Sequence, residues 1–233
     1  MWRIITYVGT SEVAGVLART DMFGVLEPAA LESIAGTGSV RPYRKGQILF
    51  ATGDPGETLF VVVEGLVKIY LTSEEGDEMN LGLRAHASVF GEVAIADGGP
   101  RTAFAEIVEQ SRLFVLGRPQ FFALLGEYPS LIERYLKVLG DIIRRSTNQA
   151  EDLVFMDLQG RVAKLLLKLA SDARGSVIDL GVSQQELANM VGGSRPTVNQ
   201  ILKAFEGRGY IALDGRKITV TEASSLERLA GAR

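Results

Sequence analysis

Hydrophobic residues follow different periods along the chain, and each period predicts a different kind of structure. Between residues 11 and 35 the apolar positions are spaced as in short helices. Over residues 40–116, short apolar runs alternate with turns rich in Gly, Pro, Asp and Glu, which is typical of an antiparallel β-barrel or sandwich. The predicted strands are 47–51, 58–63, 66–71, 80–83, 104–108 and 112–116. The helical period returns after Pro119, so we expect an α+β protein.

The longest helical segment, residues 129–153, carries a heptad seam. Its seam positions recur at alternating intervals of four and three residues: Ile132, Leu136, Leu139, Ile143, Ser146, Ala150 and Leu153. This spacing matches a coiled coil rather than an ordinary surface helix, and it predicts a parallel homodimer through residues 129–157. The alternative is one amphipathic helix that packs on its own barrel. Ser146 is the polar seam residue, and with Thr147 it either fixes the register or faces a ligand.

The heptad pattern breaks within residues 155–161, where Gly160 is expected to act as a hinge. Residues 161–170 then begin a new amphipathic helix. We therefore predict a β-barrel domain over residues 11–128, a dimerisation helix over 129–157 and a C-terminal domain over 158–233.

Residues 183–205 read as two short helices with a Gly192-Gly193 turn between them. Ser183 and Glu186 have the spacing of a capping box, which starts the first helix. Ser194 can cap the second helix, with Pro196 in its first turn. Each helix has one apolar stripe at helical spacing, made of Leu187, Ala188 and Val191 in the first and Val198, Ile201, Leu202 and Phe205 in the second.

The second of these helices has polar side chains that suit base edges and phosphates in the DNA major groove. Residues 210–220 follow as two short strands around Asp214-Gly215, a hairpin that would form a wing and reach the phosphate backbone. The alternative is an ordinary helical hairpin with a solvated face. The candidate DNA contacts are Ser194, Arg195, Thr197, Asn199, Gln200, Lys203, Arg216 and Lys217.

Composition narrows the possible functions. The chain has 233 residues, enough for two domains, and no cysteine, which excludes disulfides, thiolate metal sites and a Cys nucleophile. His86 is the single histidine, which argues against zinc hydrolases and metal-binding cupins. With no nucleophile–base pair or metal cluster, we do not expect an enzyme. No apolar run is long enough to span a membrane and residues 1–8 are too short for a signal peptide, so we expect a cytoplasmic protein.

The net charge of −3 conceals an uneven distribution. From Gly160 to the end there are 11 Lys and Arg against 7 Asp and Glu, a net charge of +4, and the preceding residues carry −7. A basic C-terminal part on an acidic body fits localised contact with phosphates, although a random partition of a few charges gives a similar result.

Residues 90–103 are a candidate anion site. Gly91 can expose backbone N–H groups, Arg101 offers two parallel donors to a phosphate, and Thr102 adds a hydroxyl. Glu92 can accept hydrogen bonds from a ribose. The alternative is a turn at the barrel edge with a Glu92–Arg101 ion pair.

In combination these motifs resemble the CRP/FNR family of bacterial transcription regulators. Four elements match in order: the glycine-rich strands at residues 45–56, the cassette at 91–103, the long helix running into residues 155–163, and the winged helix. The resemblance covers nearly everything after about Val16. It implies an N-terminal antiparallel β-barrel of jelly-roll, cyclic-nucleotide-binding type, a long coiled-coil dimerisation helix and a C-terminal winged helix-turn-helix.

The resemblance also implies a function and a ligand site. We expect a homodimeric, sequence-specific transcription regulator that cyclic AMP controls as an allosteric ligand, with a two-fold symmetric DNA operator and RNA polymerase as partners. The alternatives are a regulator that is active without nucleotide or with another effector, a module that acts on a protein partner, and cyclic GMP as the ligand. The expected contacts are Gly91 and Glu92 to the ribose, Arg101 and Thr102 to the cyclic phosphate, and Ser146 and Thr147 to the base.

The recognition helix departs from the pattern of the cyclic AMP receptor branch. Arg195 matches, and a contact to guanine is expected there. Pro196 stands where that branch has an acidic residue, and Gln200 where it has a second Arg. We therefore expect a different half-site, in which Gln200 favours adenine.

Overall fold

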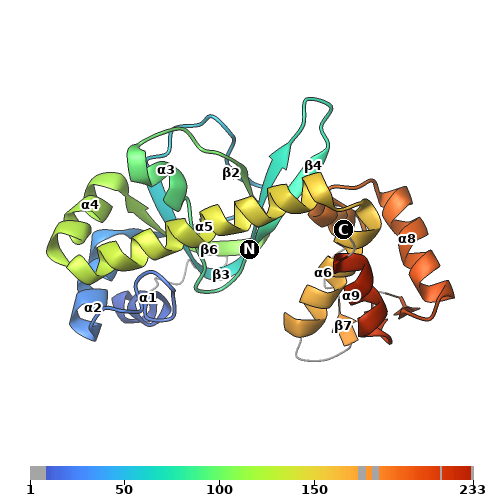
Figure 1. Ribbon diagram of the computed structural model, residues 1–233. Helices are drawn as coiled ribbons and strands as arrows, with labels where there is room; N and C mark the ends of the chain where they lie inside the picture. The colour runs from blue at the N-terminus through green and yellow to red at the C-terminus, as the bar shows by residue number, and fades with distance from the viewer. Residues whose placement is uncertain (1–8, 173–176, 180–183, 216, 232–233) are drawn as a thin grey trace, which may run out of the picture. The chain divides into compact units, whose positions relative to one another are not determined.

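The computed structural model describes residues 9–172, 177–179, 184–215 and 217–231, which form two compact units (Figure 1). The first unit comprises the chain up to Leu71 together with Leu81–Ile143, and the second comprises Thr72–Asn80 together with the chain from Arg144 onward. The predictions that concern residues 1–8, the capping residue Ser183 and the wing residue Arg216 lie outside the described residues.

An antiparallel sheet forms the centre of the first unit, as predicted. Its hydrogen-bonded order is β1-β6-β3-β4, with β2 paired to β6 and β5 paired to β3. The strands are β1 (Ser39–Tyr43), β2 (Ile48–Phe50), β3 (Thr58–Thr72), β4 (Glu78–Arg84), β5 (Val89–Phe90) and β6 (Phe104–Gly117).

Two of these strands each join segments that were predicted as separate strands. Residues 58–63 and 66–71 form one strand, β3, because Gly65 adopts φ +99° and absorbs a bulge in the pairing with β6 instead of ending the strand. A Cβ at Gly65 would lie 2.2 Å from the Ser111 hydroxyl oxygen, so only glycine fits there. On the partner strand, residues 104–108 and 112–116 likewise join into β6.

Helices precede, interrupt and follow the sheet. Pro28 lies in the first turn of α2, where its missing N–H leaves no hydrogen bond unmade. The short helix α3 was not predicted; it lies between Gly91 and Gly98, which both adopt left-handed φ angles. The helices are α1 (Thr10–Leu17), α2 (Pro28–Thr37), α3 (Glu92–Asp97), α4 (Arg118–Glu127) and α5 (Pro129–Phe155).

The apolar run at the start of β3 is continuous because both faces of the strand are buried. Leu59, Val61 and Val63 belong to a core that includes the helices, whereas Phe60 and Val62 belong to a second core within the sheet domain. This alternation places Phe60 on the same side of the sheet as Phe90.

The second unit contains the predicted helix-turn-helix and wing. Its elements are α6 (Leu158–Asp172), β7 (Val177–Asp179), α7 (Gln184–Val191), α8 (Arg195–Gly207), β8 (Ile211–Asp214), β9 (Lys217–Val220) and α9 (Ala223–Gly231). The predicted stripes of α7 and α8 are buried in one core with Val162 and Leu166 of α6. The strands pair in the order β7-β9-β8.

Two predictions in this unit were wrong in detail. Gly160 is not a hinge but lies inside α6, because Asp157 accepts a hydrogen bond from the Gly160 N–H at 2.7 Å and caps the helix. A Cβ at Gly160 would lie 3.0 Å from the Leu229 carbonyl oxygen, so the glycine allows α6 and α9 to pack side by side (Figure 1). In the wing, Asp214 pairs with Lys217 and therefore ends β8 instead of occupying the turn.

None of the helices in the described parts of the chain has the length and apolar character that a membrane span requires.

Candidate ligand-binding and DNA-binding sites

The candidate ligand site is built around Arg101, and main-chain hydrogen bonds hold the backbone of this residue in place. The Arg101 N–H donates to the Asp54 carbonyl at 2.8 Å, and its carbonyl accepts from the Gly53 N–H at 2.9 Å. A β-bridge between Pro55 and Pro100 continues this pairing. The glycine-rich loop before β3 therefore holds Arg101 at a defined position.

The Arg101 side chain is directed into the sheet domain, and the residue is only 4% exposed. Nη2 donates to the carbonyl and the hydroxyl of Thr58, at 2.7 and 2.8 Å, and Nη1 donates to the Gly91 carbonyl at 3.2 Å. The guanidinium carbon lies 4.2 Å from the centroid of the Phe50 ring and 5.7 Å from that of Phe60. Cation–π attraction to these rings helps to hold the buried charge.

One donor of this guanidinium is unsatisfied. Within the described parts of the chain, Arg101 Nε is the single buried side-chain nitrogen or oxygen without a hydrogen-bond partner. Burial lowers the pKa of Arg101, and the carboxylates of Glu92, Asp54 and Glu57 oppose this effect. A buried cation with an unused donor is destabilising unless an anion reaches it. The arrangement thus fits a phosphate group, which accepts charge-assisted hydrogen bonds from arginine.

Gly91 and Glu92 lie beside this guanidinium, as predicted. Gly91 has φ +86°, and a Cβ there would lie 2.7 Å from Arg101 Nη1 and 2.9 Å from the Thr58 carbonyl, so a larger residue would displace the arginine. Glu92 is buried and is the first residue of α3. Thr102 is exposed next to Arg101.

The structure does not test every predicted ligand contact. Ser146 and Thr147 are exposed on α5, in the part of the chain that belongs to the second unit. Their contact with a base stays a prediction.

Sequence reasoning missed the residues that hold Arg101 and its neighbours in place. Thr58, Phe50 and Phe60 were read only as strand residues, and Tyr135 only as part of the long helix. Tyr135 donates from its hydroxyl to the Glu92 carbonyl at 2.8 Å. No local sequence motif predicts these contacts, because Thr58 lies 43 residues from Arg101 in the chain and Tyr135 lies 43 residues from Glu92.

No group of three or more possible metal ligands occurs among the residues that the structure places. The hydrogen-bond donors of Arg101 suit an anion.

The candidate DNA-binding face is preorganised by its cap. Ser194 Oγ accepts from the Thr197 N–H at 3.4 Å and lies 2.8 Å from the Thr197 hydroxyl, which confirms the predicted cap of α8. The exposed candidates are Ser194, Arg195, Thr197, Gln200, Lys203 and Lys217, and Asn199 is partly exposed.

Arg161 fixes the first helix of the helix-turn-helix to α6. Its Nε donates to the Val191 carbonyl at the end of α7, at 2.9 Å, and its Nη1 donates to the Met156 carbonyl at 3.0 Å. Both acceptors are main-chain groups at points where the chain changes direction. The arginine therefore stabilises the turn that presents α8.

We expect Arg161→Ala to lower the free energy of unfolding of the second unit by about 1–3 kcal/mol, because two carbonyls lose a charged donor. Urea unfolding followed by circular dichroism measures this change. The control is Lys168→Ala, which removes an exposed cation from the same helix and is expected to have little effect. Equal stabilities of the two variants would contradict the role given to Arg161.

Both domains match known protein families. Residues 40–128 match the cyclic nucleotide-binding domain family, and residues 160–229 match the Crp-like helix-turn-helix domain family. The chain is 34% identical over 220 residues to the CRP-like cAMP-activated global transcriptional regulator of Mycobacterium tuberculosis, a match that covers 92% of this chain and 98% of the relative. It is 31% identical over 211 residues to the cyclic AMP receptor protein of Thermus thermophilus, covering 91% of this chain and 97% of the relative.

The fold agrees with a solved structure as well. The crystal structure of the Thermus thermophilus catabolite activator protein matches with a TM-score of 0.56 at 31% identity, and covers 91% of this chain and 98% of that chain. A cyclic nucleotide-binding domain followed by a Crp-like helix-turn-helix defines a DNA-binding transcription regulator. This chain belongs to the CRP/FNR family. The predicted family and fold class are therefore confirmed.

Proposed function

We propose that this regulator is a homodimer that cyclic AMP switches to a DNA-binding state, and that it has no enzymatic activity of its own. The single observation that carries the ligand proposal is the buried guanidinium of Arg101 with its unpartnered Nε. A cyclic phosphate supplies an acceptor for this unused donor. The two similar regulators named above carry cyclic AMP in their names, which supports this choice of ligand.

Each predicted contact has a chemical role in this proposal. The phosphate accepts from Arg101 and from the hydroxyl of Thr102, and the Glu92 carboxylate accepts from the ribose hydroxyl. Ser146 and Thr147 on α5 hydrogen-bond the base. The ligand shifts the population toward the DNA-binding state because it binds that state more tightly. A change from mostly inactive to mostly active protein needs a preference of about 5 kcal/mol.

The homodimer is supported by exposed apolar residues along the predicted seam of α5. Ile132, Leu136 and Ile143 are 41%, 61% and 66% exposed in the single chain, and Leu153 is 43% exposed. A second copy of α5 would cover these side chains, since seam residues of a coiled coil pack against their counterparts. A dimer would then place two copies of α8 on a two-fold symmetric operator. RNA polymerase is the further partner that we propose.

The experiment that tests this function combines calorimetry with DNA selection. Cyclic AMP should bind the purified protein, and it should raise the affinity for a DNA site selected from a random pool in a gel-shift titration. Parallel titrations with cyclic GMP test the choice of base. Selected DNA that binds equally well with and without cyclic nucleotide would favour the alternative, a regulator that needs no nucleotide.

Arg195 is proposed as a specific base contact. We expect Arg195→Ala to weaken binding to the selected site by about 1–3 kcal/mol and to relax the preference at one base pair. Lys203→Ala is the comparison, because loss of a phosphate contact should weaken binding to every sequence by a similar factor. Equal losses on selected and random DNA for Arg195→Ala would show that Arg195 contacts only the backbone.

A further inference from the structure

Two consecutive main-chain carbonyls in the ligand site are held from different directions. The Gly91 carbonyl accepts from Arg101 Nη1 at 3.2 Å, and the next carbonyl, that of Glu92, accepts from the Tyr135 hydroxyl at 2.8 Å. All four residues belong to the first unit. Arg101, the proposed phosphate-binding residue, is therefore bonded to one peptide group, and Tyr135 of α5 is bonded to the next one.

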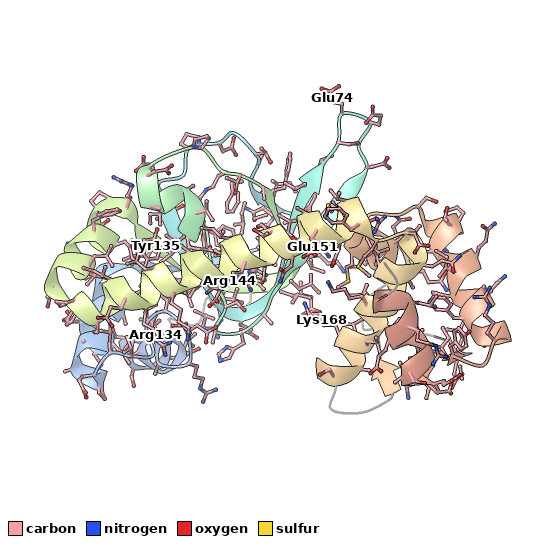
Figure 2. All side chains as sticks on the ribbon, in the orientation of Figure 1. Glu74, Arg134, Tyr135, Arg144, Glu151 and Lys168 are labelled. Atoms are coloured by element: carbon pink, nitrogen blue, oxygen red, sulfur yellow. The ribbon has the colours of Figure 1, made fainter. Side chains whose placement is uncertain are left out.

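Tyr135 is rigidly placed on α5, where Figure 2 labels it. It is 5% exposed, and its ring meets the edge of the Phe121 ring at a centroid distance of 5.0 Å and an angle of 81°. Leu131 and Tyr135 are the buried residues of α5. They pack in the core of the first unit, so this part of the helix is held close to the ligand site. A movement of the Glu92 carbonyl would therefore displace Tyr135 and, with it, this part of α5.

The Tyr135 hydroxyl is a permanent donor at neutral pH. Burial raises the pKa of Tyr135 to about 12, with Glu92 and Asp97 acting in the same direction and Arg118 opposing them. The hydrogen bond to Glu92 thus keeps its direction over the whole physiological range.

We propose that Tyr135 is a positioning residue that couples occupancy of the Arg101 site to α5 through the Glu92 carbonyl. The inference rests on the proposed function, since it concerns how that ligand acts. A phosphate that accepts from the unused Nε pulls on the same guanidinium whose Nη1 donates to the Gly91 carbonyl. The Gly91–Glu92 peptide then shifts, and the Tyr135 hydroxyl transmits the shift to the helix that carries the seam and the predicted base contacts.

The test is Tyr135→Phe, which removes the hydroxyl and leaves the ring on Phe121. Two ratios are measured with the selected operator: the gain in DNA affinity at saturating cyclic AMP, by fluorescence anisotropy, and the gain in cyclic AMP affinity with DNA present, by calorimetry. These ratios are equal by linkage. We expect both ratios to fall about fivefold, which is the change in an equilibrium constant that corresponds to the loss of one net hydrogen bond.

The matched control is Tyr128→Phe, which removes a tyrosine hydroxyl whose pKa is raised by the neighbouring Glu127 rather than by groups of the ligand site. It should leave both ratios at the wild-type value. A purely structural role of Tyr135 would lower the melting temperature and leave both ratios unchanged, and that result overturns the inference. If the wild-type protein itself shows no gain with cyclic AMP, the proposed function fails and the inference falls with it, so the two failures are told apart by the wild-type measurement.

Discussion

Arg101→Gln should weaken the binding of cyclic AMP by at least about 100-fold, which makes it the most damaging single change that we expect in the ligand site. Glutamine keeps part of the side-chain length and one amide donor group, but it carries no charge. Because the guanidinium is buried, its attraction to a phosphate is weakly screened by solvent. Isothermal titration calorimetry measures the loss, and the DNA response to cyclic AMP should disappear with it.

The same substitution also removes donors from Thr58 and Gly91, so a folding defect must be separated from a binding defect. Circular dichroism melts identify the fraction that is folded under the titration conditions. Arg101→Lys is informative because it keeps the charge and loses the planar fork, and it should retain part of the affinity.

The control for these variants is Arg112→Gln on β6, the strand that follows Arg101 in the chain. Arg112 forms ion pairs with Glu12 at 3.0 Å and with Glu64 at 2.9 Å, and its side chain is 30% exposed. Partly exposed pairs of this kind contribute little, so we expect affinity close to that of the wild type. Unchanged cyclic AMP affinity in folded Arg101→Gln would show that the ligand binds elsewhere.

The second large effect concerns the seam of α5. The double variant Leu136→Asp and Ile143→Asp should convert the proposed dimer to a monomer and abolish tight binding to a symmetric operator. Each apolar side chain that a dimer would bury contributes about 1.5–3 kcal/mol, and each occurs twice in the interface. The introduced carboxylates would also face each other across the seam. Sedimentation equilibrium measures the dissociation constant, which should rise by more than about 1,000-fold.

Lys137→Asp is the matched control, since it places a carboxylate on the same helix at an exposed position outside the seam. It should remain dimeric. A double variant that stays dimeric, or a wild-type protein that is monomeric at micromolar concentration, would contradict the proposed interface.

The local pattern predicted the elements of the fold well and their ends less well. The stripe of Val198, Ile201, Leu202 and Phe205 is buried in α8, because an amphipathic helix must turn its apolar side to a core. Glycines were harder to interpret. Gly65 was expected to end a strand and instead absorbs a bulge, and Gly160 was expected to be a hinge and instead lies where α9 approaches α6. What a glycine does depends on the neighbour that comes close to it.

The candidate site shows the same division. Gly91, Glu92, Arg101 and Thr102 were visible in the sequence as a candidate anion site, and the resemblance to the CRP/FNR family implied a nucleotide there. Their environment was not visible: Thr58 and Tyr135 reach the site only through folding, since each is 43 residues away from its partner.

By itself, then, the sequence determined most of the helices and strands, which residues carry charge and hydroxyl groups, and which helix face is apolar, because periodicity and side-chain chemistry are local properties. Only the tertiary structure decided that the Arg101 guanidinium is buried against Phe50 with its Nε unpartnered, and that the Glu92 carbonyl is held by Tyr135 from α5. Burial and long-range hydrogen bonds depend on which segments meet in space, and that information is not contained in any short stretch of the chain.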